Sequence, residues 1–457
     1  RDPAPERMAR HWEQAGQPAR AVPYYRRAAE AALEANDLDG ALQLAGRGLA
    51  RGAKGRDMGA LELVQAEVRS LRGDLGSAVQ GAQSASQLLE PLEPGWYRAL
   101  SVKASCGGTL GFPSFVREVQ HALDTHPGPT TWRRVAAFVE VGVAFLRMGN
   151  AAEATPVLAS LARLETELGT SDPRAEAWFE SGRAAWATAE GDVSRALEHR
   201  TAAARAFRRA GDVRRACLAL GEAGYARLTV GDMAGARQLI ETAHGEARRV
   251  GLPHTEALLC CLWGAVLGRV GDWDPALDIL QRAARSCSAL QDSRGEGMAR
   301  TYLASTLRRL GRTREGLDQI RKALTLLQEF PPDLAYASAL LARLQLDLGE
   351  VEAAASAISE AQSYLPGCDP MWVGEMLVRL VHAQVLQAQG DSRGAHEALS
   401  EARRKLLQRA QSLRDPALRT GYLLKVPEHA RILSMARKEL RGRGDKAAEE
   451  AGRTTDA

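Results

Sequence analysis

The amino-acid sequence predicts an all-α protein, a solenoid of about ten stacked helical hairpins. Two observations support this fold class: a turn residue that recurs every 37 to 42 residues, and small residues at fixed distances from each turn. A period near 40 that holds two helices and a tight turn is typical of helical-repeat solenoids. The turn residues are Asn36, Gly73, Gly111, Gly149, Gly191, Gly231, Gly271, Gly311, Gly349 and Gly390.

Small residues accompany every turn on both sides. Facing helices with small residues can approach closely, so each hairpin can nest against its neighbour. Seven residues before the turns stand Ala29, Ala66, Ala104, Gly142, Ala184, Gly224, Gly264, Ala304, Ala342 and Ala383. Five residues after them stand Ala41, Ala78, Val116, Ala154, Ala196, Ala236, Ala276, Gly316, Ala354 and Ala395, of which Val116 is the exception.

The residues at the turns fit the start and end of helices. Gly can adopt the positive φ that ends a helix, and a following Asp can cap the next one. This pairing occurs at Gly191-Asp192, Gly231-Asp232, Gly271-Asp272 and Gly390-Asp391. We therefore predict helix pairs over 18–51, 57–90, 96–125, 131–167, 174–210, 213–250, 254–290, 294–329, 333–364 and 371–411. The third pair is the least regular, since Gly107, Gly108, Gly111 and Pro113 lie close together.

The segments outside the repeats have separate predictions. Residues 1–16 are predicted to be a leading helix, which could end a preceding domain, and 17–411 form the repeat solenoid. Residues 412–440 are predicted to be capping helices over the last hairpin, and the charged, Gly-rich segment 441–457 to be a disordered tail. Because the sequence begins at Arg1 without an initiating Met, we expect a piece of a longer protein.

Composition excludes several classes of protein. The 457 residues carry 60 basic and 56 acidic side chains, a net charge of +4, without a basic stripe that would bind nucleic acid. Apolar runs are too short to span a membrane. Six cysteines form no CxxC pair, so a disulfide framework or zinc site is not expected, and a reducing cytoplasm is the expected location.

The hairpins resemble tetratricopeptide repeats. In that family a Gly-Asp or Gly-Asn turn joins the helices, a small residue lies within the first helix and Ala recurs twice in the second. The stretches 191–203, 231–243 and 271–283 match this pattern. The resemblance implies a right-handed superhelix, and the period near 40 is similar to that of the C-terminal repeat region of STAND-class signalling ATPases. Residues 9–28, 415–419 and 426–431 also resemble segments of large bacterial serine/threonine kinases that carry an ATPase module and repeats.

Motifs of catalysis are missing from the sequence. It has no GxxxxGK[ST] phosphate loop and no HRD or DFG kinase signature. His254 and Glu256 lack the second His of a zincin, and Cys260-Cys261 has no adjacent base. We therefore expect no enzyme activity, catalytic residue, cofactor or metal ion in this chain, although a kinase or ATPase domain could lie upstream.

Candidate binding residues follow from the family pattern, in which the first helix of each hairpin lines the concave groove. Groove positions then fall ten, six and three residues before each turn. Two arginines in the groove could pair with a carboxylate or phosphate. In the middle of the array these positions hold Val139, Val143, Leu146, Ser181, Ala185 and Thr188, and the later candidates for ligand or partner binding are Tyr225, Ser305, Arg308, Arg343 and Gln384.

Two functions remain open at this stage. The first is a regulatory repeat domain that binds a protein, a peptide or a small inducer, as the sensor arm of a bacterial signalling ATPase or serine/threonine kinase. The alternative is a free-standing scaffold that assembles partner proteins. Neither hypothesis involves nucleic acid or a membrane.

Overall fold

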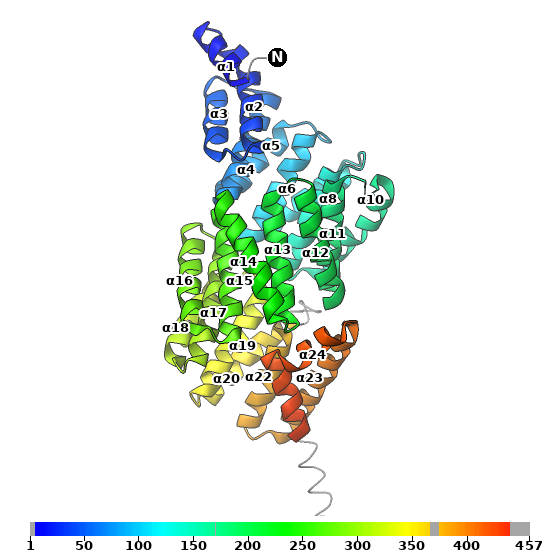
Figure 1. Ribbon diagram of the computed structural model, residues 1–457, viewed down its shortest axis with the longest axis vertical. Helices are drawn as coiled ribbons and strands as arrows, with labels where there is room; N and C mark the ends of the chain where they lie inside the picture. Colours follow the sequence, from blue (N-terminus) through cyan, green and yellow to red (C-terminus); the bar gives the residue numbers. More distant parts are fainter. Residues whose placement is uncertain (1–4, 170, 366–373, 439–457) are drawn as a thin grey trace, which may run out of the picture.

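The computed structural model describes residues 5–169, 171–365 and 374–438, and its regular structure there is α-helical throughout (Figure 1). Two helices form each of ten consecutive hairpins, except that the second helix of the fourth is divided. Helix α1(Pro5–Gln14) precedes the first hairpin. The hairpins are α2(Pro18–Glu34) and α3(Leu38–Ala50); α4(Gly55–Arg72) and α5(Leu75–Leu88); α6(Pro94–Leu110) and α7(Pro113–Thr125); α8(Trp132–Arg147) with α9(Ala151–Ala159) and α10(Leu161–Leu168); α11(Pro173–Ala189) and α12(Val193–Arg209); α13(Val213–Thr229) and α14(Met233–Val250); α15(Pro253–Val270) and α16(Trp273–Ala289); α17(Ser293–Arg309) and α18(Thr313–Leu326); α19(Pro331–Asp347) and α20(Val351–Ser363); α22(Glu375–Ala388) and α23(Ser392–Ser412).

All ten turn residues have the backbone conformation that the sequence predicts. Their φ angles run from 62° at Asn36 to 97° at Gly271, in the left-handed region that ends helices. After five of these turns an Asp side chain accepts the backbone N–H three residues on, as Asp391 does from Gly394 at 2.8 Å. Asp272 makes no such cap and instead lies 3.3 Å from Arg237.

The small residues seven positions before the turns are all buried, and three glycines show why size matters there. A Cβ atom added at Gly142, Gly224 or Gly264 would have a side-chain carbon of the second helix 2.6 Å away, from Leu158, Ile240 or Leu280 respectively. The position five residues after each turn is buried as well, and Val116 fits there fully buried. The predicted register is confirmed.

Two hairpins differ in detail from the prediction. The second helix of the fourth hairpin ends at Ala159 and restarts at Leu161, and Pro156 lies within its first part, α9. In the third hairpin, Gly107 and Gly108 lie inside α6 rather than in a loose turn. Gly108 is buried directly against Ala144 of α8, so its lack of a side chain permits close packing between the third and fourth hairpins.

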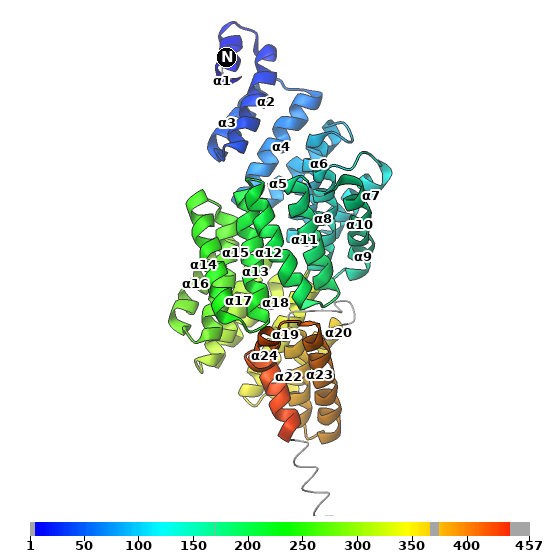
Figure 2. The ribbon, with the colours of Figure 1, turned by 45° about the vertical axis from the view of Figure 1, so that its right-hand side comes forward.

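The solenoid turns far enough for distant hairpins to touch (Figure 2). Asn36 in the first hairpin donates from Nδ2 to the Val250 carbonyl of the sixth at 3.1 Å. A Cβ added at Gly73 would lie 2.8 Å from Leu290 Cδ2, and one at Gly111 would lie 2.6 Å from Glu329 Cβ. Hairpins one, two and three therefore pack against the ends of hairpins six, seven and eight, one superhelical turn further on.

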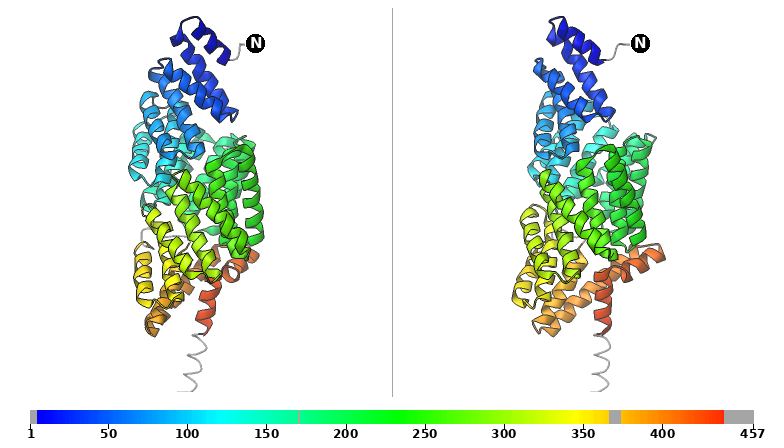
Figure 3. Two further views of the ribbon diagram at one scale, coloured as in Figure 1. Left: turned by 90° about the vertical axis from the view of Figure 1, so that its left-hand side faces the viewer. Right: turned by 60° about the vertical axis from the view of Figure 1, so that its left-hand side comes forward.

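The C-terminal helices also contact the middle of the chain. Helix α24(Pro416–Leu424) and a helix at 427–438 follow α23 and form the end opposite to α1 (Figures 1 and 3). A Cβ added at Gly231 would lie 2.5 Å from the Gly421 carbonyl oxygen of α24. Glu428 reaches Arg269 of α15 at 3.2 Å, across 159 residues of sequence. The predicted tail at 441–457 lies outside the described residues.

In the described part of the chain, none of the helices is long and apolar enough to cross a lipid bilayer.

Candidate functional site

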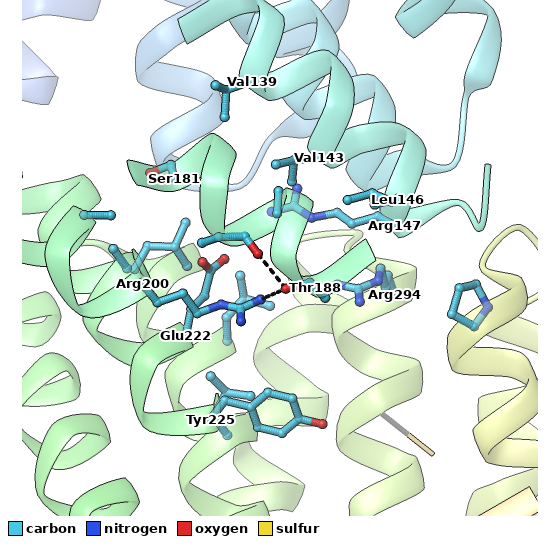
Figure 4. A pocket seen from close by; sticks show the side chains of 18 of the residues that line it. Val139, Val143, Leu146, Arg147, Ser181, Thr188, Arg200, Glu222, Tyr225 and Arg294 are labelled. Carbon is cyan, nitrogen blue, oxygen red and sulfur yellow. Dashed lines mark hydrogen bonds between the residues drawn. The ribbon is translucent and has the colours of Figure 1, made fainter. Parts of the chain in front are cut away.

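The first helices of hairpins four to nine surround a cavity of about 400 Å³ (Figure 4). This size lies within the range of sites that hold small ligands or a few residues of a peptide. The wall mixes aliphatic and aromatic side chains with a few charged groups, mainly from α8, α11, α13, α15, α17 and α19, with further residues from α12.

A stripe of side chains along each first helix forms this wall. One row stands thirteen residues before the turn, and its members are large and mostly apolar. A second row stands nine residues before the turn, and it holds Glu140, Glu222, Leu262 and Tyr302. These positions share a helix face with the groove positions predicted at six and ten residues before the turn. The row thirteen residues before the turn consists of Trp178, Leu218, Leu258, Met298 and Tyr336.

An ion pair between two hairpins lies at one side of the cavity. Glu140 of α8 accepts a hydrogen bond from Arg215 Nη1 of α13 at 2.8 Å, and the Glu140 side chain is only 9% exposed. The Arg215 guanidinium also lies 4.1 Å from the centre of the Trp178 ring on α11. Three consecutive hairpins are thus joined by one arginine, which stabilises the curvature of the wall.

Arg200 of α12 places a second cationic group in the cavity wall. Its Nη2 donates to Thr188 Oγ1 at 3.0 Å, while Thr188 donates to the Ala184 carbonyl at 2.7 Å. Burial lowers the pKa of Arg200, although the nearby Glu222 carboxylate partly opposes this effect. Figure 4 shows Arg200, Thr188 and Glu222 gathered on one side of the cavity. A buried guanidinium of this kind is stabilised by any further anion that approaches it.

Tyrosines and another ion pair form a further part of the cavity wall. The hydroxyls of Tyr225 and Tyr302 are hydrogen-bonded at 2.7 Å, and burial raises the pKa of both phenols, so both remain protonated. Arg294 of α17 donates to Asp333 of α19 at 2.6 Å. Neutral hydroxyls and a fixed guanidinium can orient a polar ligand by hydrogen bonding.

The predicted groove residues divide into two groups. Tyr225 lines the cavity, as do the six mid-array residues Val139, Val143, Leu146, Ser181, Ala185 and Thr188. Ser305, Arg308, Arg343 and Gln384 are not part of its lining. The binding role of all these residues stays a prediction.

Contacts within the protein explain the position of the second group. Arg308 donates to Asp347 at 2.9 Å, and Arg343 donates to Gln384 and also lies 3.4 Å from Asp347. Gln384 in turn lies 3.9 Å from the Met435 sulfur of the C-terminal helix. The later part of the predicted groove is therefore in contact with the protein's own C-terminal segment.

The predicted groove positions in the cavity wall include none of its charged side chains. Arg200 comes from a second helix, which the groove pattern does not include, and Arg215 stands sixteen residues before its turn. Glu140 and Glu222 share the position nine residues before the turn, one residue from the predicted row. Testing neighbouring positions for recurrent charge would have found these two carboxylates.

The chemistry of the cavity suits binding. Its cysteine, Cys261, has a pKa raised by burial, so it is held as a thiol rather than the reactive thiolate. In the described part of the chain, one His, Glu and Cys group could hold a metal ion: His244, Glu256 and Cys260. None of these three residues lines the cavity.

Fold and site together define a helical-repeat solenoid with an internal cavity. Neither a protein-family model nor a curated protein matches the chain. Among solved structures, a Rap protein complexed with competence and sporulation factor is similar over 75% of this chain and 99% of its own, with a TM-score of 0.53 and 12% identity.

Two further structures share the general arrangement at lower similarity. The Rap conjugation gene regulator of the plasmid pLS20, in complex with the Phr* peptide, covers 82% of this chain and 96% of its own at 10% identity, with a TM-score of 0.48. A STAND protein with a tetratricopeptide repeat sensor, from Pyrococcus horikoshii, matches 78% of this chain at 12% identity and a TM-score of 0.47. This chain spans about half of that protein, 55%. The order of its helices and the similarity to the first Rap protein show that the chain has the tetratricopeptide-like solenoid fold that the sequence predicted.

Proposed function

We propose that the chain is a regulatory repeat domain that binds a peptide, or a small inducer, in the central cavity. The observation that carries this proposal is the cavity itself, whose wall is drawn from six successive hairpins and combines aromatic side chains with arginines. A ligand there would lie within reach of hairpins four to nine. Binding rather than catalysis is proposed, because the cavity presents no activated nucleophile.

The charges of the wall favour a ligand that carries an anionic group. The lining includes four arginines and three carboxylates. Two of those arginines are paired with lining carboxylates, Arg215 with Glu140 and Arg294 with Asp333. Glu222, the third carboxylate, lies near Arg200, and the lining side chains together carry one excess positive charge. Trp178 and Tyr336 add apolar surface, so a carboxylate next to an aliphatic or aromatic side chain fits best.

The C-terminal segment gives an intramolecular example of such recognition. Glu428 lies buried beside Arg269, which precedes a turn of the same array. Burial raises the pKa of Glu428, but the Arg269 guanidinium, a backbone hydrogen bond and further cationic neighbours together outweigh this effect, and the net pKa is lowered. An acidic residue on a helix is therefore held as a carboxylate against the inner part of this solenoid.

A ligand in the cavity would favour one curvature of the superhelix. It would bridge α8 and α11 to α15 and α17, while contacts such as Asn36 to Val250 hold successive superhelical turns together. Because those contacts are few and local, a change in curvature would break or form them together. A ligand shifts such an equilibrium by its difference in affinity for the two forms.

We further propose that this domain is the sensor arm of a cytoplasmic bacterial multidomain signalling ATPase or serine/threonine kinase. The repeat period and the segments at 9–28, 415–419 and 426–431 support this context. The Rap protein of similar fold is complexed with competence and sporulation factor, which supports a peptide or protein as ligand. Reading the gene upstream of Arg1 tests the context: a phosphate loop or kinase signature is expected, and an upstream region without either would favour the scaffold alternative.

Selection of peptides on the immobilised chain tests ligand binding. A random heptapeptide library should yield sequences with an acidic residue next to an apolar one. Arg200→Gln should then weaken binding of the selected peptide, measured by fluorescence anisotropy, by about tenfold or more, since a charge-assisted hydrogen bond is worth roughly 1.5–3 kcal/mol. Arg205→Gln, on the exposed face of the same helix, is the matched control and should bind as the wild type does. The absence of any enriched sequence, or equal binding by Arg200→Gln, would contradict the proposal.

A further inference from the structure

A group of three potential metal ligands lies between the sixth and seventh hairpins, outside the cavity. His244 is on α14, and Glu256 and Cys260 are on α15. One ligand atom from each residue lies within 4.8 Å of the other two. Glu256 and Cys260 are four residues apart, so they share one face of their helix.

The buried imidazole of His244 points to a ligand. His244 is only 7% exposed, and its Nε2 atom is buried with no hydrogen-bond partner. That atom faces Glu256 Oε1 at 3.7 Å, which is too long for a hydrogen bond. Buried polar atoms are normally paired, so an unpaired nitrogen directed at a carboxylate and a thiol requires an explanation.

The spacing of the ligand atoms fits a tetrahedral cation. Zinc binds nitrogen, oxygen and sulfur at about 2.0 to 2.3 Å, which separates any two ligands of a tetrahedron by about 3.4 to 3.6 Å. The distance of 3.7 Å between His244 Nε2 and Glu256 Oε1 is already close to this value. The three ligand atoms lie within 4.8 Å of one another, so the Cys260 sulfur needs to move by about 1 Å to reach the same separation.

The charges around the group are compatible with zinc. A divalent cation with one thiolate and one carboxylate is neutral, so the Arg282 guanidinium nearby is tolerated. Arg282 Nη2 lies 3.6 Å from the Cys260 sulfur and can donate to it, which stabilises a thiolate ligand. The Trp263 ring lies 5.0 Å from the imidazole and restricts its orientation.

We propose that His244, Glu256 and Cys260 form a Zn²⁺ site that clamps the sixth hairpin to the seventh, with water as the fourth ligand. On binding, Cys260 loses its proton to solvent and the thiolate sulfur coordinates the ion. The group escapes motif analysis because its histidine stands on a different helix from the other two ligands.

Cobalt titration of the reduced chain tests this site. Co²⁺ substitutes for Zn²⁺ and gives a thiolate-to-metal charge-transfer band together with tetrahedral d–d bands. One equivalent of Co²⁺ should produce these bands, and Zn²⁺ should displace it. Cys260→Ser should abolish the charge-transfer band, whereas Cys261→Ser, the adjacent buried cysteine, should retain it.

A second variant keeps the test decisive if Cys260→Ser does not fold. Glu256 is one-third exposed, so Glu256→Gln should leave the helical circular dichroism unchanged while it weakens Co²⁺ binding by about tenfold or more. The proposal is overturned if the wild type shows no charge-transfer band at millimolar Co²⁺, if a folded Cys260→Ser keeps the band, or if Glu256→Gln binds Co²⁺ as tightly as the wild type.

Discussion

Replacing Gly224 by Ala should destabilise the sixth hairpin, whereas the same replacement at Gly245 should stabilise it. Gly224 stands seven residues before its turn, and an added Cβ would lie 2.6 Å from Ile240 Cγ1 and 3.2 Å from the Ala236 carbonyl oxygen. Overpacking of this kind costs about 1–3 kcal/mol. Gly245 lies on the other helix of the same hairpin with nothing within 4 Å of an added Cβ. Both variants gain about 0.8–1.0 kcal/mol of helix propensity.

The difference between the two variants isolates the steric cost, because the gain in helix propensity cancels. Native-state amide hydrogen exchange of α13 and α14 measures the local unfolding free energy. It should place Gly224→Ala about 1–3 kcal/mol below Gly245→Ala. Ile240→Ala alone should lower the free energy of unfolding by roughly 2–5 kcal/mol. In the Gly224→Ala background this loss should be smaller by about 1–3 kcal/mol, because Ile240→Ala removes the carbon that the new Cβ would meet. Equal stability of the two glycine variants would refute the role assigned to small residues in the register.

Three other perturbations test the contacts around the array. Gly231→Ala should release α24 to proteolysis, because the added Cβ would lie 2.5 Å from the Gly421 backbone oxygen. Gly271 also has a positive φ, but nothing lies within 4 Å of a Cβ added there, so Gly271→Ala should leave α24 protected. Acidification from pH 6.5 to 4 should lower the free energy of unfolding by roughly 3 kcal/mol at His429, because burial depresses the pKa of this imidazole to about 4. The neutral imidazole is the stabilising form, so its contribution is present above the unfolded-state pKa and is lost as the pH falls toward 4. In thermal unfolding His429→Gln should flatten this pH dependence, and an equally steep dependence would argue against this role of His429. Asp391→Ala should lower the free energy of unfolding in urea by about 0.5–2 kcal/mol, because the helix N-cap is lost. Asp272→Ala should lower it less, because the Asp272 side chain caps no helix. The reverse order would contradict the cap assignment.

Local features of the fold could be predicted from the sequence because they repeat. Ten turns and the small residues beside them define the helix bounds to within a few residues. The inner wall also follows from the register, so that Val143, Ala185 and Tyr225, each six residues before its turn, meet in one cavity. Every hairpin repeats the same local contacts, and the pattern therefore identifies them.

Long-range features could not be predicted in the same way. The contact of Asn36 with Val250 depends on small rotations that accumulate over five hairpins, and no single repeat encodes their sum. For the same reason Gln384 occupies the predicted register but meets the C-terminal segment instead of the cavity. Arg200 enters the wall from a second helix, which only the curvature of the array brings inward.

The central claim is that a ligand binds on the inner face of the superhelix. Hydrogen exchange of the full chain, with and without a saturating amount of the selected acidic heptapeptide, tests it most directly. Slower exchange is expected in α8, α11, α13, α15 and α17, with exchange in the outer helices α14, α16 and α18 unchanged. Protection confined to those outer helices, or no protection at all, would contradict it.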